Sequence, residues 1–587
     1  MTRTVGDATP RLLRPAVVAP FLVFLALAIS YWMHGYRIPA SDEGAILTQA
    51  SKILRGAVYY RDLDAYPFPG ATYALAGAMA LLGEHLNVAR FLATLLFCGI
   101  VVAVYSCALQ LIGAARAAVV GVSMLSFKFL ASPSLNGFFY WDFSFCFAAV
   151  SVAMFLAHLR ERSVGWLVAS GAACGVAFAS KQTVGAFLGM AALGLLLLPG
   201  AVGIAGPRTP RDRAVDALRF LGGMAIPSVP MFAYFAFHGV LPQMVSSGLL
   251  RPFVSYLPTS GLSFTAALRW WEFGAFWGVP GLPYHIEPVW TLLMEGRLPS
   301  GDWYPTYWAI SEAFSRLLYS SVVIAFAWVG VRYLRALFGR RLGADAHQFA
   351  FAVLAFAVLL SAFPRADYPH VISVYPLILV LLFSLWGATS RRWLAALVRG
   401  GEIAACVVLL VLSVGLSARQ FSFLTHELKF DTATLRVSPK SAWVDSVVKY
   451  VSAEVPEGEP ILVYGHEAFY YFLTQRFYPW PFAQLYPGQA GGDGGVALGS
   501  LMLETPPKLV LRGMIKFPGI PFLPDYAPYL DRVLKARYAR ERSVFERFPP
   551  AAGKPPRYKA FTVLSPRKPP AKNPRVKRKK PKPAIPP

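Results

Sequence analysis

PGATYALAGAMALL, residues 69–82, is the stretch on which the topology of this chain depends. It is apolar and rich in Gly and Ala, and its opening Pro-Gly suits the start of a helix. A helix needs about 20 apolar residues to cross a hydrocarbon layer of roughly 30 Å, and this stretch is shorter. If it crossed the membrane, every later segment would change sides, so its status decides which loops can share a site.

Eleven other apolar runs approach the length of a membrane span. Of the 587 residues, 56% are hydrophobic and only 15% are charged, which predicts a polytopic α-helical membrane protein with about eleven transmembrane helices. The five cysteines fall inside apolar runs, so we expect small core residues rather than disulfide partners or metal ligands. The runs are 16–35, 88–112, 117–132, 142–159, 164–180, 183–199, 217–238, 316–337, 348–363, 371–388 and 401–417.

Arginines in the short loops determine how residues 69–82 are interpreted, because such arginines stay on the cytoplasmic side. If 69–82 does not span, the short loops of the opposite face hold little beyond Lys181 and Arg365. We therefore predict that 69–82 lies in or dips into the interface, with the N-terminus cytoplasmic and the C-terminal region extracytoplasmic. The arginines that then share one face are Arg116, Arg160, Arg162, Arg208, Arg211, Arg213, Arg332, Arg335, Arg340, Arg341, Arg391, Arg392 and Arg399, joined by the N-terminal Arg3, Arg11 and Arg14.

The formal net charge of +25 has the same explanation. Much of it lies in these loops and in the basic C-terminus, so it indicates topology and not a nucleic-acid partner. Residues 16–35 also have features of a cleaved signal peptide, but the run is longer than a typical one. Cleavage would leave Asp42 on the same side of the membrane.

The chain divides into three parts by composition. Residues 1–417 form the predicted membrane domain, with a first outer loop at about 36–87 and a long, aromatic outer loop at about 239–315. Residues 418–565 predict a small soluble α/β domain, with strands at 461–465, 508–513 and 558–564 and helices at 442–453 and 525–538. Residues 566–587 are Pro-rich and basic, which predicts a disordered tail.

Ionisable residues collect on the predicted outer face, at the ends of helices far apart in sequence. Such groups are costly at the membrane unless they meet water, partners or a ligand, so a one-sided collection predicts a shared site. An acidic group facing a basic group suits a place where a phosphate leaves and a hydroxyl arrives. The residues are Asp42, Glu43, Asp62, Asp64, Asp142, Lys181, Arg365, Asp367 and His370.

Residues 41–54 also have a simpler interpretation. Their apolar residues repeat at helical spacing, which predicts an amphipathic interfacial helix. Asp42 and Glu43 then fall in its first turn, where the helix dipole favours negative charge. The other candidates have structural alternatives too: Asp142 as a helix end, Lys181 as a side chain reaching towards water, and Arg365 with Asp367 as a local ion pair.

The first outer loop resembles the C-superfamily of membrane glycosyltransferases, which includes protein O-mannosyltransferases and lipid A aminoarabinose transferases. The resemblance rests on an acidic pair after the first span, the pattern A-x-x-x-x-x-G-x-x-x-Y-x-D and a Pro-rich entry to a small-residue helix. It extends over about residues 16–200 through Asp142 and Lys181, and R-x-D-x-x-H at 365–370 is similar to a motif of some bacterial members. The loop positions are Asp42, Glu43, Ala50, Gly56, Tyr60, Asp62, Pro67 and Pro69.

This resemblance implies a sugar transfer from a polyprenyl-phosphate-linked donor to a lipid, polysaccharide or protein acceptor of the cell envelope. It also implies a bacterial inner-membrane enzyme with its C-terminal domain in the periplasm. Asp42, with Glu43, is the expected catalytic acid or base, and Lys181, Arg365 and His370 are expected to bind the donor phosphate. The supporting or acceptor-binding residues are expected to be Asp62, Asp64, Asp142 and Asp367.

Several alternatives stay open at this point. No cofactor is certain, and a divalent metal is possible, with Asp42, Glu43 and Asp142 as candidate oxygen ligands. A lipid-linked oligosaccharide flippase or another polytopic transporter is the second functional class, although transporters tend to carry ionisable positions near the midplane. An O-antigen polymerase would use the same side of the membrane but does not need the first-loop acidic motif.

Overall fold

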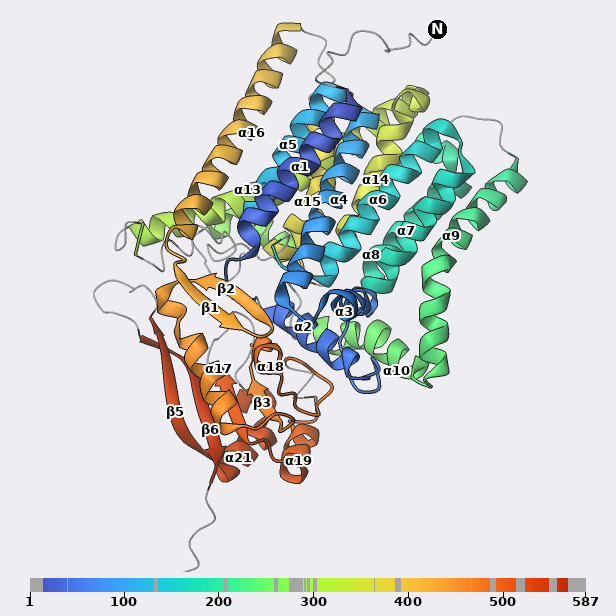
Figure 1. The fold of residues 1–587 in the computed structure, drawn as a ribbon. Coiled ribbons are helices and arrows are strands. Elements are labelled where there is room, and N and C mark those ends of the chain that lie inside the picture. Colours follow the sequence, from blue (N-terminus) through green and yellow to red (C-terminus); the bar gives the residue numbers. More distant parts are fainter. Residues whose placement is uncertain are drawn as a thin grey trace, which may run out of the picture.

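The computed structural model consists of a helical bundle and an α/β unit at one end of that bundle (Figure 1). The described residues are 14–39, 41–130, 136–204, 209–257, 262–273, 289, 292, 296–298, 303–363, 365–385, 392–465, 467–485, 492–513, 523–547 and 557–567. Of the predicted tail at 566–587, residues 568–587 lie outside them, as does much of the stretch between 274 and 302.

Each of the eleven predicted apolar runs falls on a bundle helix. Seven of these helices are long and apolar enough to span a membrane, namely α1, α4, α6, α9, α13, α15 and α16. The helices are α1 (Pro15–His34), α4 (Leu86–Ile112), α5 (Ala114–Leu130), α6 (Tyr140–Glu161), α7 (Val164–Ser180), α8 (Gln182–Leu197), α9 (Pro210–Phe237), α13 (Trp303–Phe338), α14 (Ala346–Leu360), α15 (Tyr368–Leu385) and α16 (Arg392–Phe421).

The described loops that carry the predicted cytoplasmic arginines lie at the end of the bundle away from the α/β unit (Figure 1). Tyr333 near the end of α13 donates its hydroxyl to Ala201 O at 2.6 Å, and Gly203 packs against Leu342. At the opposite end, the backbone N–H of Leu86 donates to Thr432 O of the α/β unit at 2.8 Å. The sorting of loops into two ends therefore agrees with the arrangement predicted from the arginines.

The decisive stretch forms α3 (Gly70–Leu82). It lies beside α2 (Ser41–Leu54) at the end of the bundle that carries the α/β unit (Figure 1). It packs against α2, α4, α6 and α7. The chain enters α3 from α2 and leaves it into α4 at this same end of the bundle. Helix α3 therefore does not cross the bundle, and it does not change the end at which the later loops lie.

Helix α2 is more enclosed than an interfacial helix would be. The backbone of Phe469 lies so close to Gly44 that a Cβ at this position would clash with it. The Thr48 hydroxyl donates to Ala468 O at 2.9 Å. Both partners belong to the α/β unit, which covers the face of α2 that sequence alone leaves to water or lipid. The sequence pattern predicted the helix, but a tertiary contact determined its surroundings.

The α/β unit contains two sheets. Strands β1 (His426–Phe430) and β2 (Ala433–Val437) form an antiparallel pair, and the second sheet has the order β3-β4-β6-β5. In it, β3 (Ile461–Tyr464) is parallel to β4 (Leu509–Gly513), and β6 (Arg557–Pro566) is antiparallel to β4 and to β5 (Tyr538–Arg547). Its helices are α17 (Trp443–Glu454), α18 (Phe469–Thr474), α19 (Val496–Glu504), α20 (Leu523–Tyr526) and α21 (Pro528–Arg537).

The loops contain further short elements. Helix α10 (Leu241–Val245) follows α9, and two π-helical turns follow it at Ser246–Leu250 and Pro252–Tyr256. The remaining 3-10 turns are Pro199–Val202, Phe264–Leu268, Trp270–Glu272, Leu342–Asp345 and Pro439–Ser441.

Candidate active site

Asp42 lies in the first turn of α2, at the junction of the bundle and the α/β unit. It is close enough to His370, Arg365 and Asp367 for their charges to act on it. Burial raises the pKa of the Asp42 carboxyl, because the charged form loses hydration. The structure thus brings together an acidic residue of the first loop and a cluster more than 300 residues later in the chain.

Arg365, Asp367 and His370 form one hydrogen-bonded cluster at the start of α15. Arg365 Nε donates to Asp367 Oδ2 at 2.5 Å, and His370 Nδ1 lies 2.5 Å from Asp367 Oδ1. Asp367 is 6% exposed, whereas Arg365 and His370 on either side of it remain partly accessible. A buried carboxylate that holds a guanidinium and an imidazole can present both groups together to an anion.

The loop before α15 is anchored from two directions. The N–H of Ala366 donates to Leu262 O at 3.0 Å, and the buried hydroxyl of Tyr319 on α13 donates to Ala366 O at 2.7 Å. The ring of Trp141 lies 5.6 Å from the His370 ring, centroid to centroid. The fold therefore fixes the cluster on structured elements rather than on a free loop.

Lys181 joins the same region from the turn between α7 and α8. Its Nζ donates to Ser361 O at 3.0 Å, and the charges of Asp367 and Asp142 act on it. Asp142, in the first turn of α6, is 2% exposed and also lies within electrostatic reach of Lys128 on α5. Lys128 was not predicted as a site residue. Its signal in the sequence is a single lysine at the end of the apolar run 117–132.

Glu43 is held by a different partner from the residues of the Arg365–Asp367–His370 cluster. Its Oε1 lies 3.5 Å from Arg90 Nε on α4, and both side chains are nearly buried, at 3% and 4% exposed. Arg90 also donates to three backbone carbonyls between the first span and α2. These acceptors are His34 O at 2.6 Å, Tyr36 O at 2.8 Å and Arg37 O at 3.0 Å. Glu43 and Arg90 therefore fix the start of α2. Arg90 was not predicted as a partner of Glu43, and its signal in the sequence is a lone arginine in the apolar run 88–112.

The two later acidic residues of the first loop have different partners. Asp62 pairs with its neighbour Arg61 at 2.7 Å on the surface. Asp64 pairs with Arg251 of the long outer loop at 2.5 Å, and burial raises the pKa of the Asp64 carboxyl, partly offset by Arg251. Arg251 was not predicted as a partner.

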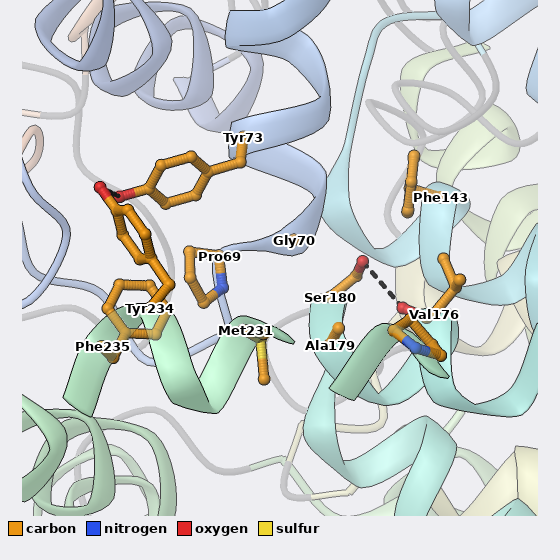
Figure 2. A pocket seen from close by; sticks show the side chains of 11 residues that line it. Pro69, Gly70, Tyr73, Phe143, Val176, Ala179, Ser180, Met231, Tyr234 and Phe235 are labelled. Atoms are coloured by element: carbon orange, nitrogen blue, oxygen red, sulfur yellow. Dashed lines mark hydrogen bonds between the residues drawn. The ribbon is translucent and has the colours of Figure 1, made fainter. Parts of the chain in front are cut away.

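An apolar cavity of about 300 Å³ lies beside the charged region, between α3, α6, α7 and α9 (Figure 2). Phe143 and Ser180 in its wall are the chain neighbours of Asp142 and Lys181. The hydroxyls of Tyr73 and Tyr234 meet at one side of it, 3.5 Å apart. The lining residues are Pro69, Gly70, Tyr73, Phe143, Val176, Ala179, Ser180, Pro227, Met231, Tyr234 and Phe235.

The packing of α7 against α9 explains why the cavity exists. A Cβ at Gly171 would lie 2.1 Å from Phe220 O, and one at Gly175 would lie 2.4 Å from Met224 O, so the helices touch backbone to backbone there. Beyond this contact α9 contains Pro227 and Pro230. Proline removes a helical hydrogen bond and kinks or breaks the helix, so the two helices separate where the cavity begins.

Among the described residues, no three His, Cys, Asp or Glu side chains gather closely enough to hold a metal ion. The three oxygen ligands suggested by the sequence do not form such a group there, since Glu43 is paired with Arg90.

Residues 66–205 match a family model described as dolichyl-phosphate-mannose-protein mannosyltransferase. No curated protein sequence matches this chain. Among solved structures, the oligosaccharyltransferase of Archaeoglobus fulgidus in complex with zinc and sulfate is 11% identical with a TM-score of 0.49, over 92% of this chain and 73% of that chain. ArnT from Cupriavidus metallidurans bound to undecaprenyl phosphate is 15% identical with a TM-score of 0.43, over 94% and 97%.

The matched segment covers α3 to α8 and includes Asp142 and Lys181. It begins within the first outer loop, after Asp42 and Glu43. Over residues 66–205, the chain therefore carries the sequence pattern of the dolichyl-phosphate-mannose-protein mannosyltransferases, and its resemblance to the C-superfamily of membrane glycosyltransferases is confirmed there.

Proposed function

We propose that this protein is a membrane glycosyltransferase that moves a sugar from a polyprenyl-phosphate donor to a hydroxyl of a cell-envelope acceptor. The observation that carries the proposal is the position of Asp42 beside the Arg365–Asp367–His370 cluster, with Lys181 adjoining the same cluster. The family match over residues 66–205 supports the same reaction class.

The proposed reaction needs two kinds of group, and the site contains both. The acceptor oxygen attacks the anomeric carbon while its proton passes to the Asp42 carboxylate, a role worth typically 10² to 10⁴-fold. The bond between the anomeric carbon and the phosphate oxygen breaks, and its electron pair leaves with the lipid phosphate. Arg365, Lys181 and protonated His370 stabilise the charge that develops on that phosphate.

The apolar cavity supports a donor whose phosphate is attached to a lipid. Ser180 and Lys181 are consecutive, so an apolar chain in the cavity can place its phosphate near the cations. A soluble nucleotide sugar has no apolar part that needs such a cavity. The cavity is therefore proposed to hold the first isoprene units of the donor.

The distribution of charge favours a transferase over a transporter. Transporters tend to place ionisable or helix-breaking positions near the midplane. Here α1, α7, α8, α14 and α15 contain no Asp, Glu, Lys or Arg. The gathered charges instead belong to the first turns of α2 and α6, the end of α5, the loop before α15 and the turn between α7 and α8. We propose that this end of the bundle faces away from the cytoplasm, in the inner membrane of a bacterium.

The proposal is tested in two assays. The purified protein in nanodiscs is supplied with polyprenyl-phosphate-linked sugars and envelope extracts, with and without a metal chelator, and sugar transfer is followed by mass spectrometry. In cells, deletion of the gene should leave an envelope component underglycosylated and polyprenyl-phosphate sugar accumulated. Unchanged envelope glycans together with unchanged lipid-linked pools would contradict the transferase.

A further inference from the structure

One segment of the α/β unit, residues 477–485, lies against the first outer loop. Lys52 Nζ on α2 donates to Tyr478 O and Trp480 O, each at 2.9 Å. The N–H of Asp64 donates to Pro481 O at 2.9 Å. The segment is also tied to its own unit, since the Tyr478 hydroxyl donates to Thr505 O at 2.9 Å. We call residues 477–485 the docking segment.

Gln484 is the residue of the docking segment that reaches Asp42. Its Nε2 lies 2.7 Å from Ser41 O, 2.8 Å from Ser41 Oγ and 3.4 Å from Asp42 Oδ1, so one of its two N–H groups is shared between two of these acceptors. The side chain is 8% exposed, so the amide is largely withdrawn from water. It thus donates to the backbone at the start of α2 and to the carboxylate that follows.

Gln484 is not needed to hold the α/β unit in place. Lys52 binds the docking segment independently, and Arg55, directly after α2, donates to Gln475 Oε1. Other connections are made by the backbone, including the N–H of Arg37 to Arg436 O at 2.9 Å. Because these contacts share the attachment of the α/β unit, the bond from Gln484 to Asp42 is expected to affect the Asp42 carboxylate rather than the attachment.

We propose that Gln484 is a positioning residue that fixes the carboxylate of Asp42 in the orientation needed to accept the proton of the acceptor hydroxyl. This inference rests on the proposed function for its catalytic meaning. The α/β unit thereby completes a site whose other parts belong to the bundle. A carboxylate held by one donor has fewer rotamers than a free one, and it stays oriented when the acceptor enters.

The same bond affects the proton affinity of Asp42. Burial raises the pKa of its carboxyl, and the hydrogen bond from Gln484 lowers it. The other charged groups acting on Asp42 are His370 and Arg365, which lower the pKa, and Asp367, which raises it. Removal of the amide donor therefore shifts protonation of Asp42 towards higher pH, because only the charged form is stabilised by the bond.

The test uses the full-length protein in nanodiscs and two matched glutamines. Gln484→Met removes the donor at similar size, and Gln475→Met removes another hydrogen bond between the α/β unit and the first outer loop, the one from Arg55, without touching Asp42. For Gln484→Met we expect kcat for sugar transfer to fall about tenfold, the donor KM to change little, and the acid limb of the pH profile to move to higher pH. Gln475→Met is expected to retain wild-type values.

Labelling of Asp42 with a carbodiimide gives a second readout that needs no transfer activity. The reagent modifies the protonated carboxyl, so peptide mass spectrometry at a series of pH values reports the midpoint directly. We expect this midpoint to move to higher pH in Gln484→Met and in Gln484→Leu, which removes the donor without adding a charge, but not in Gln475→Met. An unchanged midpoint in both Gln484 variants overturns the inference.

The two readouts separate this inference from the proposed function. A shifted labelling midpoint in a protein that transfers no sugar would contradict the transferase and leave the contact between Gln484 and Asp42 standing. Normal transfer by the wild type with an unchanged kcat in Gln484→Met would leave the transferase standing and overturn the positioning role. If Gln484→Met does not fold, as judged by gel filtration, Gln484→Leu decides.

Discussion

Asp42 combines two properties that are unfavourable for stability and useful for a reaction. Its carboxyl lies where burial raises its pKa, and it is surrounded by groups that belong to distant parts of the chain. Such a residue is costly to keep charged inside a fold. A raised pKa brings a carboxylate closer to the proton affinity that a general base needs near neutral pH.

Replacement of Asp42 by Asn is expected to abolish transfer while leaving the protein folded. The variant removes the proton acceptor, so kcat should fall by about 10² to 10⁴-fold. Stability at pH 7 should be equal or higher, because a buried charge is removed. Transfer assays and thermal unfolding measure the two effects.

Asp62→Asn is the matched control for this prediction. Asp62 belongs to the same loop, but it pairs on the surface with Arg61. Its replacement should leave transfer close to the wild-type rate. Full turnover by Asp42→Asn would remove Asp42 from the base role.

The raised pKa of Asp42 also predicts how transfer depends on pH. A general base must be deprotonated, so kcat/KM should fall as the pH drops through the raised pKa. The acid limb is therefore expected above the ordinary range of an aspartate, which lies near 3.9. It is measured by rates across a pH series, and an acid limb at the ordinary value would contradict the burial argument.

Arg90 is predicted to contribute to the fold rather than to the reaction. Arg90→Met leaves Glu43 buried without its cation and three carbonyls without their donor, a loss of about 3 to 5 kcal/mol. Arg160→Met breaks a surface pair with Glu161, worth about 0 to 1 kcal/mol. Thermal unfolding in detergent compares the two, and equal melting temperatures would contradict the structural role.

At the scale of elements, the contact between α7 and α9 creates space beside the site. Glycines allow the helices to touch, and the prolines of α9 then let them separate, which leaves the apolar cavity. In helices that faced lipid on all sides, the same glycines and prolines would create no cavity. They do so only because α7 and α9 pack against each other.

Met231→Trp is predicted to fill part of the cavity. The larger side chain competes with an isoprenoid chain, so the KM for a long-chain donor should rise about tenfold or more, with kcat less affected. A donor analogue with a short chain should be affected less. Met190→Trp, at a position 59% exposed on α8, is the control. Equal KM values for the two variants would show that the cavity does not hold the donor chain.

At the scale of the whole molecule, the α/β unit and the first outer loop share one end of the bundle, while the arginine-bearing loops occupy the other (Figure 1). The positive-inside rule then predicts opposite compartments for these two ends. The proposed site lies at the end that carries the α/β unit, so a donor and an acceptor must both reach that compartment.

Single introduced cysteines test this arrangement. The native cysteines are buried or half-buried in the helices, so they interfere little with labelling. We expect a membrane-impermeant maleimide on intact spheroplasts to label Glu457→Cys in the α/β unit but not Arg341→Cys at the other end. Labelling of both positions only after permeabilisation would contradict the predicted orientation. Labelling of Arg341→Cys alone in intact spheroplasts would show the opposite orientation.

The sequence by itself determined the elements of the membrane part. Hydrophobic periodicity is a local property, so the eleven runs, the short helix at residues 69–82 and the strands β3, β4 and β6 could each be predicted from neighbouring residues, whereas β1, β2 and β5 were not predicted. The sorting of loops could be predicted as well, because arginine placement follows from the membrane rather than from packing.

Only the tertiary structure decided which charged residues belong together. Asp42 and Glu43 are adjacent in the same helical turn, yet Asp42 faces the cluster around Asp367 while Glu43 is held by Arg90. The contribution of Gln484 could not be predicted either, since it follows Asp42 by 442 positions. The physical reason is that a local pattern fixes where a helix begins and which residues share its face. The partner of a buried charge is fixed instead by how distant elements pack.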